Sequence, residues 1–256
     1  MRQFFLSCRD LPAVGDVVTL DAEESHHLLK VLRGGTQAGL QLVDGRGHRL
    51  AARSAGQQGR LAQVEITAVT ADEAEAAAPL LRLVCGVVKG RRWEYALEKA
   101  VECGVHAVVP LLTEHGVVDP GRGRRERWQT ILRSALKQSG RCLLPDLAVP
   151  LDLDRFLELP GEGPVVFGAV PAERDVPAVA AMSCARPGGP PPAWLTVAVG
   201  PEGGWTLQER RALLDSGAVP LDLGPHVLRT ETAVVAALTL AQQWRQGWHL
   251  PKAHPD

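Results

Sequence analysis

Two loops in the second half of the chain combine residue types suited to binding and catalysis. The first, residues 199–204, reads Val-Gly-Pro-Glu-Gly-Gly and follows the apolar run 194–198. Its glycines let another group approach the backbone closely, because no Cβ stands in the way. The same composition also suits a tight turn from a strand into a helix. No Gly-Lys-Ser/Thr sequence follows, so the loop is not expected to cradle phosphate.

The second loop, residues 223–233, reads Leu-Gly-Pro-His-Val-Leu-Arg-Thr-Glu-Thr-Ala and leads into a helical pattern. Thr230 suits the N-cap of that helix. Arg229 stands among apolar positions where a solvated charge is not expected, so a purely structural role explains it less well than Thr230. His226 is interpreted as structural, and no further His or Cys accompanies it as a metal ligand. The chain has no Gly-x-Ser-x-Gly nucleophile elbow.

The elements that must position these loops are alternating strands and helices. Apolar runs occupy residues 81–88, 105–112, 164–170, 194–200 and 219–224, and helical spacing occurs at 91–104, 125–140, 206–217 and 230–244. Thr206 and Glu209 form a capping-box pattern at one helix start. Repeated strand–helix units with apolar strands predict an α/β fold with a parallel sheet covered on both faces. Ligands bind such sheets at the carboxyl ends of the strands, which is where both loops lie.

The front of the chain has a different pattern. β-rich runs at 14–20, 40–55 and 59–69 are separated by glycine-containing turns, with a short helix-like segment at 24–39. This pattern predicts a small β-barrel-like domain over residues 1–72. The acidic, alanine-rich segment 71–79 has the composition of a linker. The α/β domain is expected over residues 80–250.

Composition narrows the classes of protein. Hydrophobic residues make up 45% and charged residues 22% of the 256 residues, which is ordinary for a globular protein. No apolar run approaches the roughly 20 residues of a membrane helix, and the start does not read as a signal peptide. Five widely spaced cysteines without a Cys-x-x-Cys pair argue against a disulfide scaffold or a zinc cluster. We expect a cytoplasmic protein with reduced thiols and no bound metal.

The charge is unevenly distributed. Residues 73–142 carry twelve Lys or Arg against eight Asp or Glu, whereas residues 143–256 carry eight against thirteen. A basic middle beside an acidic end is a weak indication of an anionic partner that meets one surface.

Several motifs in order along the chain resemble one family. They are His27–Arg33 (HLLKVLR), Glu98–Val105 (EKAVECGV), Gln138–Arg141 (QSGR) with Pro145, Gly200–Trp205 (GPEGGW) and Leu223–Ala233 (LGPHVLRTETA). On these motifs the chain resembles the SPOUT superfamily of S-adenosylmethionine methyltransferases. Within that superfamily it is similar to the RsmE-type enzymes, which methylate N3 of a uridine in 16S (small-subunit) ribosomal RNA. The resemblance covers nearly the whole chain.

The resemblance implies a fold and a cofactor. The front domain would be a PUA-like β-barrel that binds RNA, and the α/β domain would contain a deep trefoil knot whose loops hold S-adenosylmethionine. The enzyme would be a homodimer that acts on small-subunit ribosomal RNA or on the assembled subunit. The methionine and ribose side of the cofactor would be lined by Val199, Gly200, Pro201, Gly203 and Gly204. The adenine would be enclosed by Leu223, Gly224, Leu228, Arg229 and Thr230.

Methylation of N3 needs a base and a group that stabilises negative charge, because N3 carries a proton. Arg229 is the candidate for stabilising charge on the uracil or for anchoring its phosphate. Glu231 or Glu202 is the candidate base, although either could instead complement a helix N-terminus. A salt-sensitive RNA surface is predicted from a set of basic residues that singly could each be a solvated charge. The set is Lys30, Arg33, Lys89, Arg91, Arg92, Arg122, Arg124, Arg125 and Arg141.

Three positions depart from the family pattern. Cys103 stands where Leu is common and Lys137 where Glu is common, and His115 replaces an Arg, which puts an RNA or subunit contact near 115 in doubt. Two other functions stay open. One is a SPOUT methyltransferase that acts on transfer RNA or large-subunit RNA, at a ribose 2′-oxygen. The other is a non-catalytic RNA-binding homologue, against which the intact loop motifs argue.

Overall fold

The computed structural model describes residues 3–33, 39–116, 122–159, 162–169 and 190–249. The chain divides into two compact units. The first unit comprises Met1–Ala77 with Arg133–Leu144, and the second comprises Ala78–Leu132 with Pro145–Asp256. Residues 133–144, which the sequence analysis placed within the second domain, therefore group with the first unit.

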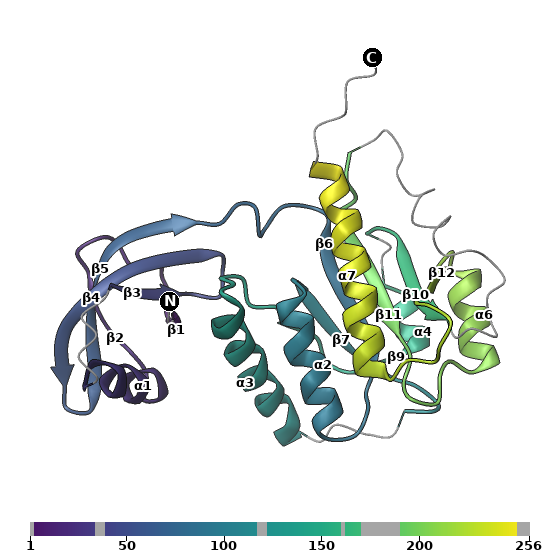
Figure 1. Cartoon of the computed structure of the whole chain (residues 1–256), viewed down its shortest axis with the longest axis horizontal. Helices are drawn as coiled ribbons and strands as arrows, with labels where there is room; N and C mark the ends of the chain where they lie inside the picture. Colours follow the sequence, from purple (N-terminus) through teal and green to yellow (C-terminus); the bar gives the residue numbers. More distant parts are fainter. Residues whose placement is uncertain (1–2, 34–38, 117–121, 160–161, 170–189, 250–256) are drawn as a thin grey trace, which may run out of the picture. The chain divides into compact units, whose positions relative to one another are not determined.

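The first unit is built on a five-stranded sheet in the order β1-β3-β4-β5-β2 (Figure 1). Its elements are β1 (Gln3–Phe5), β2 (Val17–Thr19), α1 (Ala22–Arg33), β3 (Leu40–Val43), β4 (His48–Gln58) and β5 (Leu61–Ala71). β1 pairs with β3 in parallel, and the other pairs are antiparallel. Alternate residues of these strands point inward, so that Leu42, Leu50 and Ile66 are fully buried in one core with Leu28 of α1.

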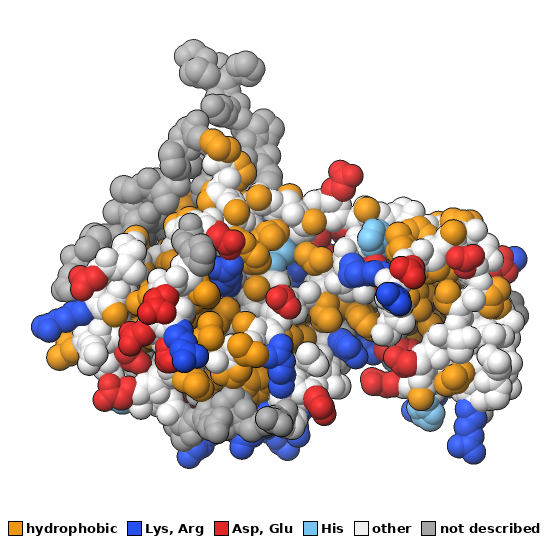
Figure 2. Space-filling view, turned by 180° about the vertical axis from the view of Figure 1, so that it is seen from behind, with side chains coloured by type: hydrophobic (Ala, Val, Ile, Leu, Met, Phe, Trp, Pro, Cys, Tyr) orange, Lys and Arg blue, Asp and Glu red, His pale blue; other side chains and the backbone are white. Residues whose placement is uncertain are grey.

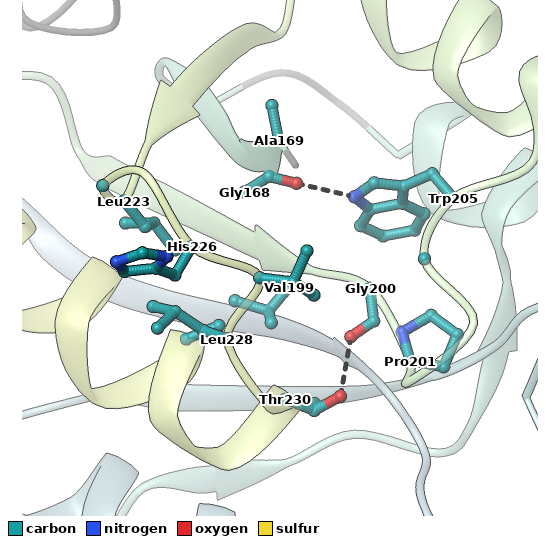
Figure 3. Close-up of a pocket in the computed structure, with 14 residues that line it drawn as sticks. Gly168, Ala169, Val199, Gly200, Pro201, Trp205, Leu223, His226, Leu228 and Thr230 are labelled. Carbon is teal, nitrogen blue, oxygen red and sulfur yellow. Dashed lines mark hydrogen bonds between the residues drawn. The ribbon is translucent and has the colours of Figure 1, made fainter. Parts of the chain in front are cut away.

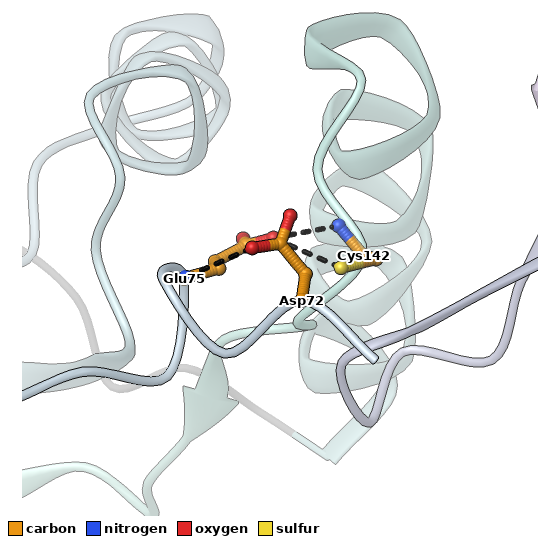
Figure 4. A group of neighbouring side chains, drawn as sticks. All are labelled: Asp72, Glu75 and Cys142. Atoms are coloured by element: carbon orange, nitrogen blue, oxygen red, sulfur yellow. Dashed lines mark hydrogen bonds between the residues drawn. The ribbon is translucent and has the colours of Figure 1, made fainter. Parts of the chain in front are cut away.

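The segment that follows β5 is fastened to residues after α3, within the first unit (Figure 4). Glu75 accepts hydrogen bonds from the backbone N–H of Cys142, at 3.0 Å, and from Nε of Arg141, at 2.5 Å. Asp72 accepts one from Nη2 of Arg49, at 3.0 Å. The two carboxylates are thus balanced by two guanidinium groups. Burial raises the pKa of the Cys142 thiol to about 12, and its hydrogen bond to Glu75 acts in the same direction.

The second unit is a parallel sheet in the order β12-β10-β11-β6-β7-β8, with β9 also paired to β7. Its strands are β6 (Leu80–Gly86), β7 (Ala107–Leu112), β8 (Asp146–Leu147), β9 (Leu151–Asp152), β10 (Val165–Ala169), β11 (Trp194–Val199) and β12 (Val219–Asp222). Its helices are α2 (Arg91–Glu102), α4 (Leu153–Leu157), α6 (Leu207–Asp215) and α7 (Thr230–His249), together with the first part of α3 (Arg122–Ser139). The expected α/β class is confirmed.

Helices pack closely on this sheet. α7 lies along β11 and β6 and packs against α2 (Figure 1). In β11 every residue from Leu195 to Val199 is buried, as expected for a strand covered on both faces. The described part of the chain contains no helix with the length and apolar character needed to cross a membrane.

The strand order brings three carboxyl ends together. β10 pairs on one side with β11, where Phe167 is opposite Ala198, and on the other with β12, where Gly168 is opposite Leu221. All three strands run in the same direction, so the loops that leave them emerge side by side at one edge of the sheet.

Candidate functional site

The loops after β11 and β12 line a single hollow with the end of β10 (Figure 3). β10 contributes Gly168 and Ala169, and the remaining lining lies in 199–205 and 223–233. The hollow has a volume of about 60 Å³ and is partly open to solvent.

Most residues predicted to bind the cofactor lie along this hollow. They are Val199, Gly200, Pro201, Gly204, Leu223, Gly224, Leu228 and Thr230. Gly203 and Arg229 lie outside the lining. The structure therefore brings together two loops that are separated in the sequence by α6 and β12.

A hydrogen bond between Thr230 and Gly200 joins the two loops. The Thr230 hydroxyl donates to the Gly200 carbonyl at 3.2 Å, and the threonine is buried (Figure 3). Thr230 is the first residue of α7, one position inside the N-cap place predicted for it. Because both groups are at the rim of the hollow, this bond fixes the start of α7 against the glycine-rich loop.

Trp205 is a further lining residue that the sequence analysis did not assign to the site. Its indole N–H donates to the Gly168 carbonyl at 3.1 Å, and its ring covers Gly200 (Figure 3). A Cβ on Gly200 would lie 3.2 Å from the ring. The position of Trp205 directly after the glycines was visible in the sequence, but its contact with β10 was not. His226, interpreted from the sequence as structural, also lines the hollow.

The glycine-rich loop is supported from behind by neighbouring segments. A Cβ on Gly86, at the end of β6, would lie 2.7 Å from the Pro201 nitrogen, so only glycine fits there. His115 Nδ1 lies 3.0 Å from the Gly203 carbonyl oxygen. Glu209 accepts a hydrogen bond from the Glu114 backbone N–H at 3.0 Å and completes the predicted capping box with Thr206.

The candidate catalytic residues differ in their surroundings. Glu202 is exposed and forms an ion pair with Arg92, itself a predicted RNA-binding residue. Glu231 is half-buried, and its Oε2 is buried without a hydrogen-bond partner among the described residues. Buried carboxylate oxygens normally have a hydrogen-bond partner, which makes Glu231 Oε2 unusual. Arg229 is exposed at the start of α7.

Eight of the nine predicted RNA-binding residues fall into three groups. Exposed side chains belong to Lys30, Lys89, Arg91, Arg92 and Arg124. Arg125 is half-buried and donates to the Leu147 carbonyl at 2.6 Å. The side chains of Arg33 and Arg122 lie outside the described part of the chain. Figure 2 shows basic and acidic side chains interspersed on one face, without a continuous basic area.

Arg141 does not fit the predicted role. Its side chain is only 10% exposed and is held by Glu75. A guanidinium buried against a carboxylate stabilises the first unit and is not available to a phosphate. We therefore remove Arg141 from the proposed RNA-binding set.

The fold and the hollow define the class of protein when they are compared with known proteins. A family model described as an RNA methyltransferase domain matches residues 76–242, which include both loops. The crystal structure of a ribosomal RNA small subunit methyltransferase E from Neisseria gonorrhoeae, bound to S-adenosyl methionine, is similar with a TM-score of 0.81 and 31% identity. The similarity covers 95% of this chain and 97% of that one. The chain has the fold of a SPOUT-type RNA methyltransferase, as expected.

Curated relatives give the particular family. The ribosomal RNA small subunit methyltransferase E of Synechocystis sp. is 33% identical over 86% of this chain and 71% of its own length. That of Mycobacterium tuberculosis is 31% identical over 91% of this chain and 90% of its own. This chain belongs to the ribosomal RNA small subunit methyltransferase E family.

Proposed function

We propose that this chain transfers a methyl group from S-adenosylmethionine to N3 of one uridine in the 16S RNA of the small ribosomal subunit. The observation that carries the proposal is the hollow formed by the loops after β11 and β12 and closed by the Thr230–Gly200 hydrogen bond. Membership of the small-subunit RNA methyltransferase family supports the general reaction. The atom and the nucleotide rest on the motifs described above.

The residues of the hollow suit S-adenosylmethionine. Leu223, Leu228 and Ala233 offer apolar surface for the adenine, while the glycines expose backbone groups to the polar parts. The ring over Gly200 leaves no room for a larger side chain there. When bound, the cofactor would supply a methyl group on a positively charged sulfur. A nucleophile that attacks this methyl group displaces the sulfur, which leaves as a neutral thioether.

The protein must prepare the uracil for this transfer. N3 lies on the Watson–Crick edge, so the base has to be unpaired or turned out of its stack. The N3–H bond is replaced by an N3–CH3 bond, and the proton leaves to a base. We assign that base to Glu231, because its buried oxygen lacks a partner whereas Glu202 is engaged by Arg92. Arg229 stabilises the negative charge on the uracil as the proton leaves.

Positive charge close to the hollow supports RNA binding. Lys89, Arg91 and Arg92 follow the carboxyl end of β6, the strand next to β11. They therefore lie at the sheet edge from which the glycine-rich loop leaves, and Arg92 contacts that loop through Glu202. The proposed partner is small-subunit ribosomal RNA, free or in the assembled subunit, in the cytoplasm. We also propose that the active species is a homodimer.

A single experiment tests the substrate. Purified protein would be incubated with methyl-labelled S-adenosylmethionine and unmethylated small ribosomal subunits, followed by mass spectrometry of the RNA nucleosides. We expect N3-methyluridine at one site. Label in another nucleoside or at a ribose 2′-oxygen would support methyltransferase activity but contradict uridine N3 as the target atom. Label only with transfer RNA or large-subunit RNA would reject the substrate. If the protein binds no S-adenosylmethionine at all, the alternative of a non-catalytic RNA-binding protein would be favoured.

A further inference from the structure

A second hollow lies within the first unit, between α1 and the turn that joins β4 to β5. It has a volume of about 730 Å³. The larger side chains that line it belong to His26, Leu29, Lys30, Gln57, Arg60 and Leu61. The hollow belongs to neither the cofactor loops nor the residues that the reaction requires.

The walls of this hollow are held in fixed positions. Ser25 of α1 is fully buried, and its hydroxyl donates to the Leu20 carbonyl at 3.0 Å. The same oxygen accepts a hydrogen bond from the Ala62 backbone N–H of β5 at 2.9 Å. Leu28 anchors α1 in the core of the unit. A hollow with such fixed walls needs little reorganisation to receive a ligand.

The charge in the hollow is positive and uncompensated. His26 and Lys30 are four residues apart and lie on the same face of α1, and Arg60 faces them from the turn. Lys30 and Arg60 are exposed, and neither forms an ion pair with the side chains that the structure describes. The acidic Glu24 of α1 lies on the other face and is neutralised by Lys137. Two cations without counter-charges attract an anion.

The remaining lining is suited to a nucleobase. Leu29 and Leu61 provide apolar surface, the His26 ring can stack, and the Gln57 amide can both donate and accept hydrogen bonds. Recognition of single-stranded RNA combines these elements, with cations for the backbone and flat or apolar surfaces with polar groups for the unstacked base.

We propose that this hollow binds one unpaired nucleotide of the RNA substrate. Lys30 and Arg60 hold its phosphodiester, and His26, Gln57 and the two leucines contact its base. The proposal rests on the proposed function only in taking RNA as the substrate. A free phosphate or a mononucleotide offers the same anionic chemistry, so the test must separate these sources.

The test measures binding of a fluorescently labelled, unstructured RNA of about a dozen nucleotides by anisotropy. The double variant Lys30→Gln with Arg60→Gln is compared with Arg53→Gln with Arg155→Gln, which removes the same charge at exposed sites outside both hollows. We expect the hollow variant to bind RNA about tenfold more weakly, and its slope of log affinity against log salt to fall by about 0.7, for one phosphate that is no longer neutralised. The control should keep at least half of the wild-type affinity.

Equal weakening in the two variants would overturn the proposal, since it would reflect net charge alone. Displacement of the RNA by millimolar inorganic phosphate as effectively as by uridine monophosphate would also overturn it, because the site would then bind a free anion without recognising a base. Methylation assays separate this inference from the proposed function. In them the hollow variant should raise KM for RNA about tenfold with kcat unchanged. If the wild type methylates no small-subunit RNA, the proposed function is wrong. The anisotropy measurement then still tests whether the hollow beside α1 binds RNA.

Discussion

His115 is in direct contact with the backbone of Gly203, with its Nδ1 3.0 Å from the Gly203 carbonyl oxygen. A Cβ on Gly203 would lie 2.7 Å from the His115 Cβ. This contact explains why Gly203 belongs to the glycine-rich loop although it does not line the hollow. His115, one of the three departures from the family pattern, therefore lies against the glycine-rich loop. The imidazole supports the cofactor loop from outside the hollow.

Gly203→Ala should therefore displace the loop. We expect a loss of about 1–3 kcal/mol in the free energy of unfolding and weaker S-adenosylmethionine binding, because an added methyl group overpacks the contact with His115. Chemical denaturation and calorimetric titration measure the two effects. His115→Gly in the same chain should restore much of the loss, because the closest contact is with the His115 Cβ, which alanine would keep. Gly123→Ala, at an exposed position of α3 with open space around it, is the matched control and should be neutral or stabilising by up to about 1 kcal/mol.

Thr230→Val removes the hydroxyl that joins the two loops while keeping the shape of the side chain. The Gly200 carbonyl then loses a donor, and we expect unfolding to become easier by about 1 kcal/mol. The affinity for S-adenosylmethionine should fall about fivefold, because the same 1 kcal/mol or so must then be spent on positioning the two loops that line the hollow. Thr239→Val removes a hydroxyl that lies outside the hollow, where it donates to the Val235 carbonyl and also hydrogen-bonds with the Cys103 thiol. An equal loss of affinity in that control would contradict the assigned role of Thr230.

Glu231→Gln tests the assigned base. We expect kcat for RNA methylation to fall about 10²–10⁴-fold, because the amide cannot accept the N3 proton. S-adenosylmethionine affinity should stay within about twofold, since Glu231 is not part of the hollow's lining. Glu202→Gln should change kcat by less than about threefold. If the two effects are reversed in single-turnover rates, Glu202 is the base.

The stability of the first unit should depend on acid through Asp72. The hydrogen bond from Arg49 lowers the pKa of Asp72 below its usual value, and further backbone and charge contacts add to this effect. A carboxylate with a lowered pKa in the folded state contributes stability above its unfolded pKa of about 3.9, and this contribution is lost as the pH falls through the folded value. As the pH falls below about 4, the unfolding free energy of Asp72→Asn should therefore fall less steeply than that of the wild type. Urea titrations at each pH measure this, and Asp215→Asn, in exposed α6 surface, should follow the wild type.

Much of the second unit was predictable because its strands are continuous apolar runs. The run 194–200 became β11 (Trp194–Val199) and the run 219–224 became β12 (Val219–Asp222). The capping box of Thr206 and Glu209 is likewise a local pattern, and it is present. The short strands β8 and β9 and the five-residue α4 were not predicted. Two-residue strands carry no periodicity, and tertiary pairing alone defines them.

The sequence by itself determined the α/β class, the separate β-rich front and the two loops that carry the chemistry, because apolar periodicity, glycine content and capping residues act over a few neighbouring positions. Tertiary structure decided which groups meet. The strand order placed the Trp205 indole on Gly168, at a sequence separation of 37, and set Arg141 against Glu75, at a separation of 66. The same holds for the basic hollow beside α1. Hydrogen bonds and ion pairs act over a few ångströms, so their partners depend on how distant segments pack and leave no local pattern in the chain.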